Sequence, residues 1–189
     1  MEQGLVYLRA LELGDLERTY KWHSDPDLYK TIGGTFRFSS RHSEEDWLRK
    51  KAAFSNNELN LAICLVETGE HIGNIYMRNI DWVARSGDLT GIMIGVAEYQ
   101  KRGYAFNAIY LIIKHAFKDL GLHRLTGFML ADNAASIRLM DKLNFKREGL
   151  MRQASFKEGV YRDVYMYSQL ANEFFELEEK LNKLPQISG

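Results

Sequence analysis

The chain has 189 residues, of which 46% are hydrophobic and 26% are charged, and these values are typical of one globular domain. Its 25 basic and 25 acidic residues cancel at pH 7, which argues against a protein that binds nucleic acid through a large basic surface. The one cysteine, Cys64, excludes a disulfide within the chain, and we expect it to pack as a small hydrophobic side chain.

The N-terminus has no basic segment followed by a long apolar one, so we do not expect a signal peptide. No apolar run approaches the about 20 residues that a membrane helix needs. The sequence also contains no repeat, low-complexity tract or linker. We therefore expect a cytoplasmic protein without a membrane anchor, with residues 1–189 forming a single domain.

The first half of the chain is predicted to contain two helices among short strands. Strand-forming residues and turn signals predict strands at 5–9, 59–66, 71–80 and 88–96. A helix is expected over 16–23, after Gly14 and a capping Asp15, and a second one from Ser43 to about residue 54. Residues 29–40 are predicted to form a loop that bends at Gly33 and Gly34.

The second half is predicted to alternate strands and helices. Helices are expected over 103–120, ended by Gly121, over 134–143, preceded by Asp132 and Asn133, and over 170–184. Strands are expected at 124–130, 146–156 and 160–168. This order favours an α/β fold of the α+β type, in which helices cover both faces of a mixed, mostly antiparallel sheet of about seven strands.

One strand–helix junction has the properties of a phosphate site. Residues 99–107 read YQKRGYAFN and separate two apolar runs. A helix that starts there leaves backbone N–H groups unpaired at its positive end, Gly103 allows close approach of a ligand, and Lys101 and Arg102 supply positive charge. The pattern fits neither a P-loop nor a dinucleotide fingerprint. A surface turn with two solvated cations is the alternative.

A second segment, residues 133–145 with the sequence NAASIRLMDKLNF, makes the interpretation more specific. Together the two segments resemble the Q/R-x-x-G-x-G/A and N-x-x-S/A-x-x-x-Y-x-K-x-G-F motifs of the GNAT superfamily of acetyltransferases. The matching residues are Gln100, Gly103, Ala105, Asn133, Ser136, Lys142 and Phe145. The resemblance covers nearly the whole chain and is greatest to the branch of the ribosomal-protein N-terminal (alanine) and spermidine acetyltransferases.

This resemblance implies a co-substrate and its site. Acetyl-CoA would bind in a V-shaped opening between two diverging parallel strands, here residues 92–96 and 126–130. The implied contacts are backbone groups of Met93, Ile94 and Gly95 with the pantetheine arm, amides of Gln100, Lys101, Arg102, Gly103, Tyr104, Ala105 and Phe106 with the pyrophosphate, and Asn133, Ser136 and Lys142 with the rest of the cofactor. The acetyl group would pass directly from the thioester to a primary amine.

The catalytic groups are less clear from the residues. Many family members have a tyrosine that protonates the departing thiolate, but Met140 occupies that position here and cannot donate a proton. Either the thiolate leaves without this acid, or the domain is a non-catalytic acetyl-CoA sensor or partner-binding module. Asp88 is the candidate base, because it opens the strand that would carry the thioester; it could equally be a solvated strand-edge residue.

The acceptor is left open among a protein N-terminus, a polyamine and an amino sugar. A polyamine site needs converging carboxylates, which Asp25, Asp27, Glu44, Glu45 and Asp46 could provide. The five histidines lack metal-ligand spacing, so we expect them to be packed or at the surface and we expect no metal. The last helix, with Phe174 and Phe175, could pack on the domain or form a homodimer.

Overall fold

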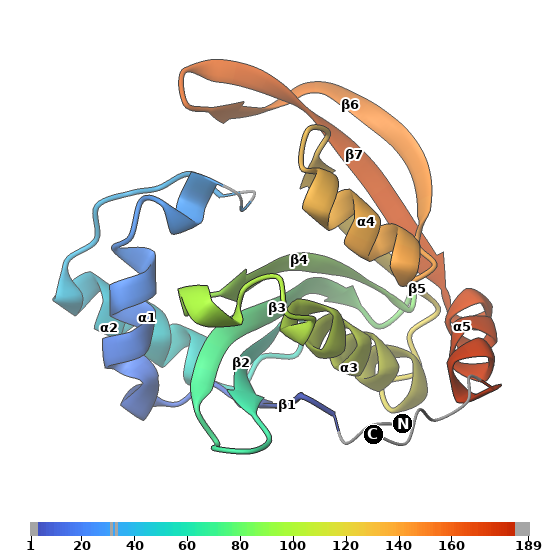
Figure 1. The fold of residues 1–189 in the computed structure, drawn as a ribbon, viewed down its shortest axis with the longest axis horizontal. Helices are drawn as coiled ribbons and strands as arrows, with labels where there is room; N and C mark the ends of the chain where they lie inside the picture. The colour runs from blue at the N-terminus through green and yellow to red at the C-terminus, as the bar shows by residue number, and fades with distance from the viewer. Residues whose placement is uncertain (1–3, 31, 33, 184–189) are drawn as a thin grey trace.

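The computed structural model describes residues 4–30, 32 and 34–183. These residues form one seven-stranded sheet with the strand order β1-β2-β3-β4-β5-β7-β6 (Figure 1). Only the pair β4 and β5 is parallel within this sheet. The predicted fold class is therefore confirmed. The strands are β1 Val6–Ala10, β2 Leu59–Leu65, β3 His71–Asp81, β4 Ser86–Ile94, β5 Arg124–Leu130, β6 Lys146–Lys157 and β7 Val160–Leu170.

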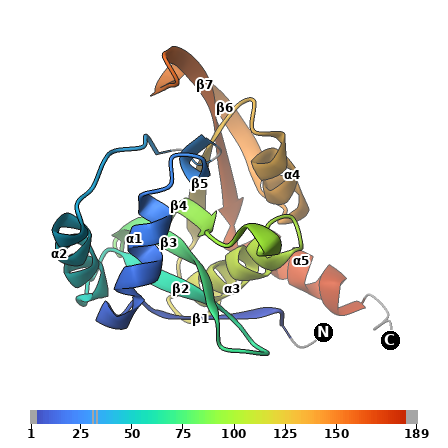
Figure 2. The same cartoon turned by 60° about the vertical axis from the view of Figure 1, so that its left-hand side comes forward.

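Helices cover both faces of the sheet (Figure 2). Helix α3 lies on one face, whereas α1 and α2 lie on the other. The α-helices are α1 Leu16–His23, α2 Arg41–Ala52, α3 Tyr104–Lys118, α4 Ala134–Lys142 and α5 Ala171–Lys183. Short 3-10 helices occur at η1 Leu13–Asp15, η2 Leu28–Lys30 and η3 Ala97–Tyr99. No helix in the described ranges has the length and apolar character needed to cross a membrane.

Strand β2 is buried on both sides and joins the two helical layers. Side chains alternate across a strand, so Ile63 enters the main core with α3, whereas Ala62 and Cys64 face α1 and α2. The smaller cluster also contains Leu11 and Leu48. Cys64 is fully buried there without a disulfide, as predicted.

Strands β4 and β5 pair only along their first residues. The parallel register runs from Ser86 with Arg124 to Leu89 with Gly127 and then ends. At the same place the register between β3 and β4 shifts, so no described residue of β3 or β5 is in register with Thr90. A bulge of this kind bends a strand and ends pairing. Beyond Thr90, β4 stays with β3 and β5 stays with β7, which opens the sheet between them.

One helix cap and one helix start differ from the prediction. Asp15 makes no side-chain cap for α1, because its carboxylate accepts from Arg9 at 2.7 and 2.8 Å and lies 3.0 Å from His71 Nδ1. Helix α2 begins at Arg41 instead of Ser43, because Ser40 is the residue whose hydroxyl accepts from the Ser43 N–H. In the first case Arg9 occupies the carboxylate that would otherwise cap the helix, and in the second the capping serine lies three residues earlier in the chain.

Other boundaries shift by a few residues. Strand β4 occupies Ser86–Ile94, and α3 ends at Lys118 before the left-handed Gly121. The last helix begins after residue 170, and its predicted end at residue 184 lies outside the described residues, as does the predicted bend at Gly33. Phe174 packs against Phe117 in α3, with ring centroids 5.5 Å apart. Helix α5 therefore packs on the domain, and the homodimer stays a prediction.

Candidate functional site

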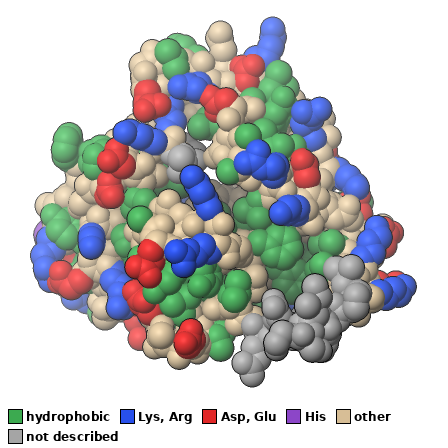
Figure 3. All heavy atoms as spheres, in the orientation of Figure 1, with side chains coloured by type: hydrophobic (Ala, Val, Ile, Leu, Met, Phe, Trp, Pro, Cys, Tyr) green, Lys and Arg blue, Asp and Glu red, His purple; other side chains and the backbone are tan. Residues whose placement is uncertain are grey.

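Two adjoining cavities lie where the sheet opens. The larger one, of about 510 Å³, lies between β3, β4 and the segment from α1 to α2; we call it the large cavity. The smaller one, of about 110 Å³, lies between β4 and β5 beside α3 and α4; we call it the slot. Ile32, Thr90, Gly91 and Ile92 line both. The surface in Figure 3 is hollowed near its centre, with Lys and Arg side chains beside the hollow.

The slot has one wall made by α4. Asn133 Oδ1 accepts from the Ser136 N–H at 3.0 Å and caps this helix, as predicted, and both residues line the slot. Met140 lines it as well and is buried against Gly127, where a Cβ would lie 3.8 Å from the Met140 sulfur. A thioether supplies packing there and no O–H donor.

The end of β4 is partly occupied by internal hydrogen bonds. The Gly95 N–H donates to Ile72 O at 2.9 Å, and Gln100 Nε2 donates to Ile94 O at 3.1 Å. Gly95 has a separate structural reason to be glycine, because a Cβ there would lie 2.2 Å from the Trp22 ring. Of the three residues predicted to contact the pantetheine arm, Met93 is also buried and lines the large cavity.

The junction before α3 keeps a set of backbone amides outside the helical hydrogen bonding. The bond from Asn107 N to Gly103 O, 3.1 Å long, is the first of α3, so the N–H groups of Tyr104, Ala105 and Phe106 precede it. Lys101 and Gly103 have φ of 61° and 90°, a left-handed backbone that suits glycine. Lys101 and Arg102 are exposed beside this positive helix end. The geometry suits a phosphate group.

Lys142 and Asp88 are among the predicted site residues that line neither cavity. Lys142 is exposed at the end of α4. Asp88 lies in the closed part of the sheet, in register with Arg78 and Thr126, and accepts from Asn79 Nδ2 at 2.8 Å. Their proposed roles stay predictions that this geometry does not test.

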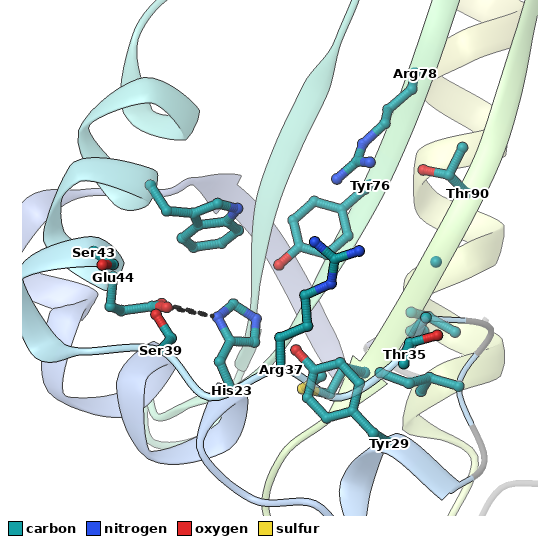
Figure 4. A pocket seen from close by; sticks show the side chains of 16 residues that line it. His23, Tyr29, Thr35, Arg37, Ser39, Ser43, Glu44, Tyr76, Arg78 and Thr90 are labelled. Atoms are coloured by element: carbon teal, nitrogen blue, oxygen red, sulfur yellow. Dashed lines mark hydrogen bonds and ion pairs between the residues drawn. The ribbon is translucent and has the colours of Figure 1, made fainter. Parts of the chain in front are cut away.

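A buried carboxylate and a histidine meet in the large cavity (Figure 4). Glu44 is only 3% exposed, and its Oε1 lies 2.8 Å from His23 Nδ1. The end of α1 supplies His23, the first turn of α2 supplies Glu44, and Trp47 packs edge-on against the imidazole with centroids 4.7 Å apart. A carboxylate on Nδ1 fixes the ring and leaves Nε2 for another partner.

The opposite wall of the large cavity is formed by β3. Tyr76 and Arg78 are two residues apart and therefore share a face of the strand, and the Arg78 guanidinium lies 5.6 Å from the Tyr76 ring centroid. Within the described residues, the Tyr76 hydroxyl and Arg78 Nε are buried without a hydrogen-bond partner. Burial raises the pKa of Tyr76 well above its ordinary value, so the hydroxyl stays neutral at pH 7.

Sequence reasoning missed most of this cavity. His23 is packed, as expected, but it also lines the cavity, and Arg37, Tyr76 and Arg78 were not predicted. The spacing of Tyr76 and Arg78 on a predicted strand is the one signal that places them on a common face. Among the predicted carboxylates Glu44 alone lines the cavity, and its neighbour Glu45 forms an ion pair with Arg49 at 2.6 Å instead. The described residues contain no cluster suited to a metal ion.

Comparison with known proteins gives a consistent family. Residues 6–146 match the family described as acetyltransferase (GNAT) domain. An uncharacterized N-acetyltransferase p20 of Bacillus licheniformis is 29% identical over 88% of this chain and 93% of its own. The spermidine N(1)-acetyltransferase of Vibrio cholerae is 24% identical over 91% and 96%. A crystal structure of the V. cholerae spermidine N-acetyltransferase with CoA and spermine superposes with a TM-score of 0.82 at 23% identity, covering 90% of this chain and 98% of that one, which shows a common fold.

Proposed function

The chain belongs to the GNAT family of acetyltransferases, and we infer that it moves the acetyl group of acetyl-CoA directly to a primary amine held in the large cavity. One observation carries this inference: the slot between β4 and β5 and the large cavity meet at Thr90, Gly91 and Ile92. A thioester in the slot and an amine in the large cavity would therefore face each other at the bulge, which supplies the proximity that acyl transfer requires.

Acetyl-CoA is proposed to bind along the opening between β4 and β5. Its pyrophosphate binds at the start of α3, where the amides of Tyr104, Ala105 and Phe106 have no helical acceptor and Lys101 and Arg102 add charge. Asn133 and Ser136 line the slot on the other side. The Gly95 N–H is already bonded to Ile72, so the pantetheine arm would pair with other groups of β4.

His23 is proposed to accept the proton of the amine. An alkyl ammonium group must lose a proton before its nitrogen can attack, and Glu44 orients the imidazole so that neutral Nε2 is the proton acceptor. In Figure 4 the ring stands between Glu44 and the interior of the cavity. Asp88, the base predicted from the sequence, lines neither cavity and is the alternative that experiment should separate.

The proposed reaction does not require a proton donor at position 140. The amine nitrogen forms a bond to the thioester carbonyl carbon, a backbone N–H near the Thr90 bulge stabilises the oxyanion, and the carbon–sulfur bond then breaks. CoA departs as a thiolate, and the amine proton passes through His23 to the thiolate or to water. Met140 therefore does not require a sensor function, and the cavity beside the slot favours transfer over binding alone.

The test is release of CoA thiol from acetyl-CoA in the presence of a panel of amines. Activity that depends on the amine establishes the enzyme, whereas acetyl-CoA binding without release from any amine contradicts the proposed transfer. His23→Gln should lower kcat/KM by about 100-fold or more, with acetyl-CoA affinity unchanged. Exposed His42 provides the matched control, His42→Gln, which should retain activity. A loss caused by Asp88→Asn instead would assign the base to Asp88.

A further inference from the structure

The large cavity is lined by more positive than negative side chains, whereas a positively charged amine substrate would be bound better by a negative site. Two arginines, Arg37 and Arg78, line it, and Glu44 is the one carboxylate among its described lining residues. Glu44 is already bonded to His23. A substrate that carried only amines would thus meet two guanidinium groups and no available carboxylate.

Arg78 is held in place but lacks a direct anionic partner in the described part of the chain. It lies over the Tyr76 ring, and its buried Nε makes no hydrogen bond to any residue that the structure describes. The charges near it are otherwise engaged: Glu58 forms an ion pair with Lys51, and Asp88 accepts from Asn79. A buried guanidinium nitrogen without a partner is costly, which indicates that a ligand satisfies it.

Arg37 approaches the same space from the other side. It is exposed on the segment between η2 and α2, and no ion pair or hydrogen bond of its side chain is present among the described residues. In Figure 4 the guanidinium groups of Arg37 and Arg78 point toward one another beside the Tyr76 ring. The Tyr76 hydroxyl, which is also buried and has no partner among the residues described, lies beside them as a third donor.

We propose that the acceptor carries an anionic group, a carboxylate or a phosphate, as well as its amine, and that Arg37 and Arg78 bind this group while the amine faces His23 and the bulge. Guanidinium groups recognise both anions through paired hydrogen bonds, and the Tyr76 hydroxyl can add another. This proposal rests on the acetyltransferase function above and narrows its acceptor. It separates this chain from its relative named for spermidine, which is a polycation.

Matched pairs of acceptors test the proposal. Each α-amino acid is compared with its amide, and glucosamine 6-phosphate with glucosamine, so that only the anionic group changes within a pair; spermidine is the polycationic reference. We expect kcat/KM for the anionic member of at least one pair to exceed that of its neutral partner by about tenfold or more, which is the contribution of one charge-assisted hydrogen bond. The pair that shows the preference identifies the anion as carboxylate or phosphate.

Variants then assign the preference to the two arginines. Arg78→Gln and Arg37→Gln should each reduce the ratio between the anionic and neutral acceptors toward one, mainly through KM of the acceptor, with acetyl-CoA binding unchanged. Arg18→Gln removes the same charge from an exposed position on α1 that lines neither cavity, and it should keep the wild-type ratio. Circular dichroism of each variant confirms that it folds.

The contrary outcomes are distinct. Equal or better use of the neutral amines or spermidine would refute the anionic acceptor while leaving the acetyltransferase in place, and a preference that survives both arginine variants would refute the binding site. If no amine releases CoA, the transferase proposal fails. Calorimetry of the CoA-loaded protein with N-acetylated acids and their amides then decides the arginine site, since equal affinities for both would refute it.

Discussion

A methyl group at position 95 would collide with the indole of Trp22. The Cβ of an alanine would lie 2.2, 2.3 and 2.5 Å from three ring atoms, where about 3.4–4 Å is an ordinary contact, so the ring or the strand must move by more than 1 Å. Trp22 is 3% exposed and packs edge-on against His71, which leaves no free space for that movement. We therefore expect Gly95→Ala to reduce the free energy of unfolding by about 3 kcal/mol, the upper part of the usual range for overpacked cores.

Urea unfolding followed by circular dichroism measures this loss. Gly91→Ala is the matched control, because Gly91 lies in β4 four residues before Gly95 and its Cβ would approach nothing closer than 3.8 Å, in the ring of Tyr76. The control should remain within about 1 kcal/mol of the wild type, since alanine replaces a glycine in a strand interior. For a chain of this size, a loss of about 3 kcal/mol in the free energy of unfolding corresponds to a fall in Tm of about 6–12 °C for Gly95→Ala.

A double variant tests the stated cause. Trp22→Leu removes the ring that the new methyl group would strike, so Gly95→Ala should cost less in that background than in the wild type. Equal costs in the two backgrounds, or a Gly95→Ala protein as stable as Gly91→Ala, would show that α1 does not pack on β4 through this contact and would refute the reasoning.

Two smaller effects follow from a helix cap and an ion pair. Ser40→Ala removes the acceptor for the Ser43 N–H and should lower the free energy of unfolding, measured with urea, by about 1 kcal/mol. A variant as stable as the wild type would show that Ser40 does not stabilise the start of α2. Hydrogen bonds from Arg124 and Ser168 lower the pKa of Glu148 to about 2, so this carboxylate stabilises the fold above its ordinary pKa and the contribution is lost as the pH falls from about 4.5 to 2. The urea midpoint of Glu148→Gln should therefore decline less than that of the wild type over this interval, and parallel declines would be inconsistent with the pair.

Local patterns were sufficient for the elements because they depend on neighbouring residues. The strand over 124–130 and the helix over 16–23 were predicted at their observed bounds, since side-chain periodicity and turn residues specify both. The capping residues were harder. Asp15 is a good cap by type, but Arg9 of β1 binds its carboxylate, and the capping pattern at the helix start does not reveal that contact.

The two halves of the site differ for the same reason. The start of α3 and the α4 wall of the slot belong to two segments with recognisable motifs, residues 99–107 and 133–145, so the sequence could propose them as one site. The large cavity combines His23, Arg37, Glu44 and Arg78 from separate segments. No spacing along the chain connects them, and they become neighbours only when α1 and α2 pack on the face of β3.

The wall that the two cavities share makes their ligands energetically interdependent. Ile32 belongs to both cavities, and its carbonyl accepts a hydrogen bond from the buried Lys157 at the tip of the β6–β7 hairpin. A ligand that shifts this residue from one side changes the space available on the other. By linkage, the factor by which acetyl-CoA alters the affinity for the amine must equal the factor by which the amine alters the affinity for acetyl-CoA. We therefore expect substitutions of Lys157, which contacts this shared residue, to change both affinities.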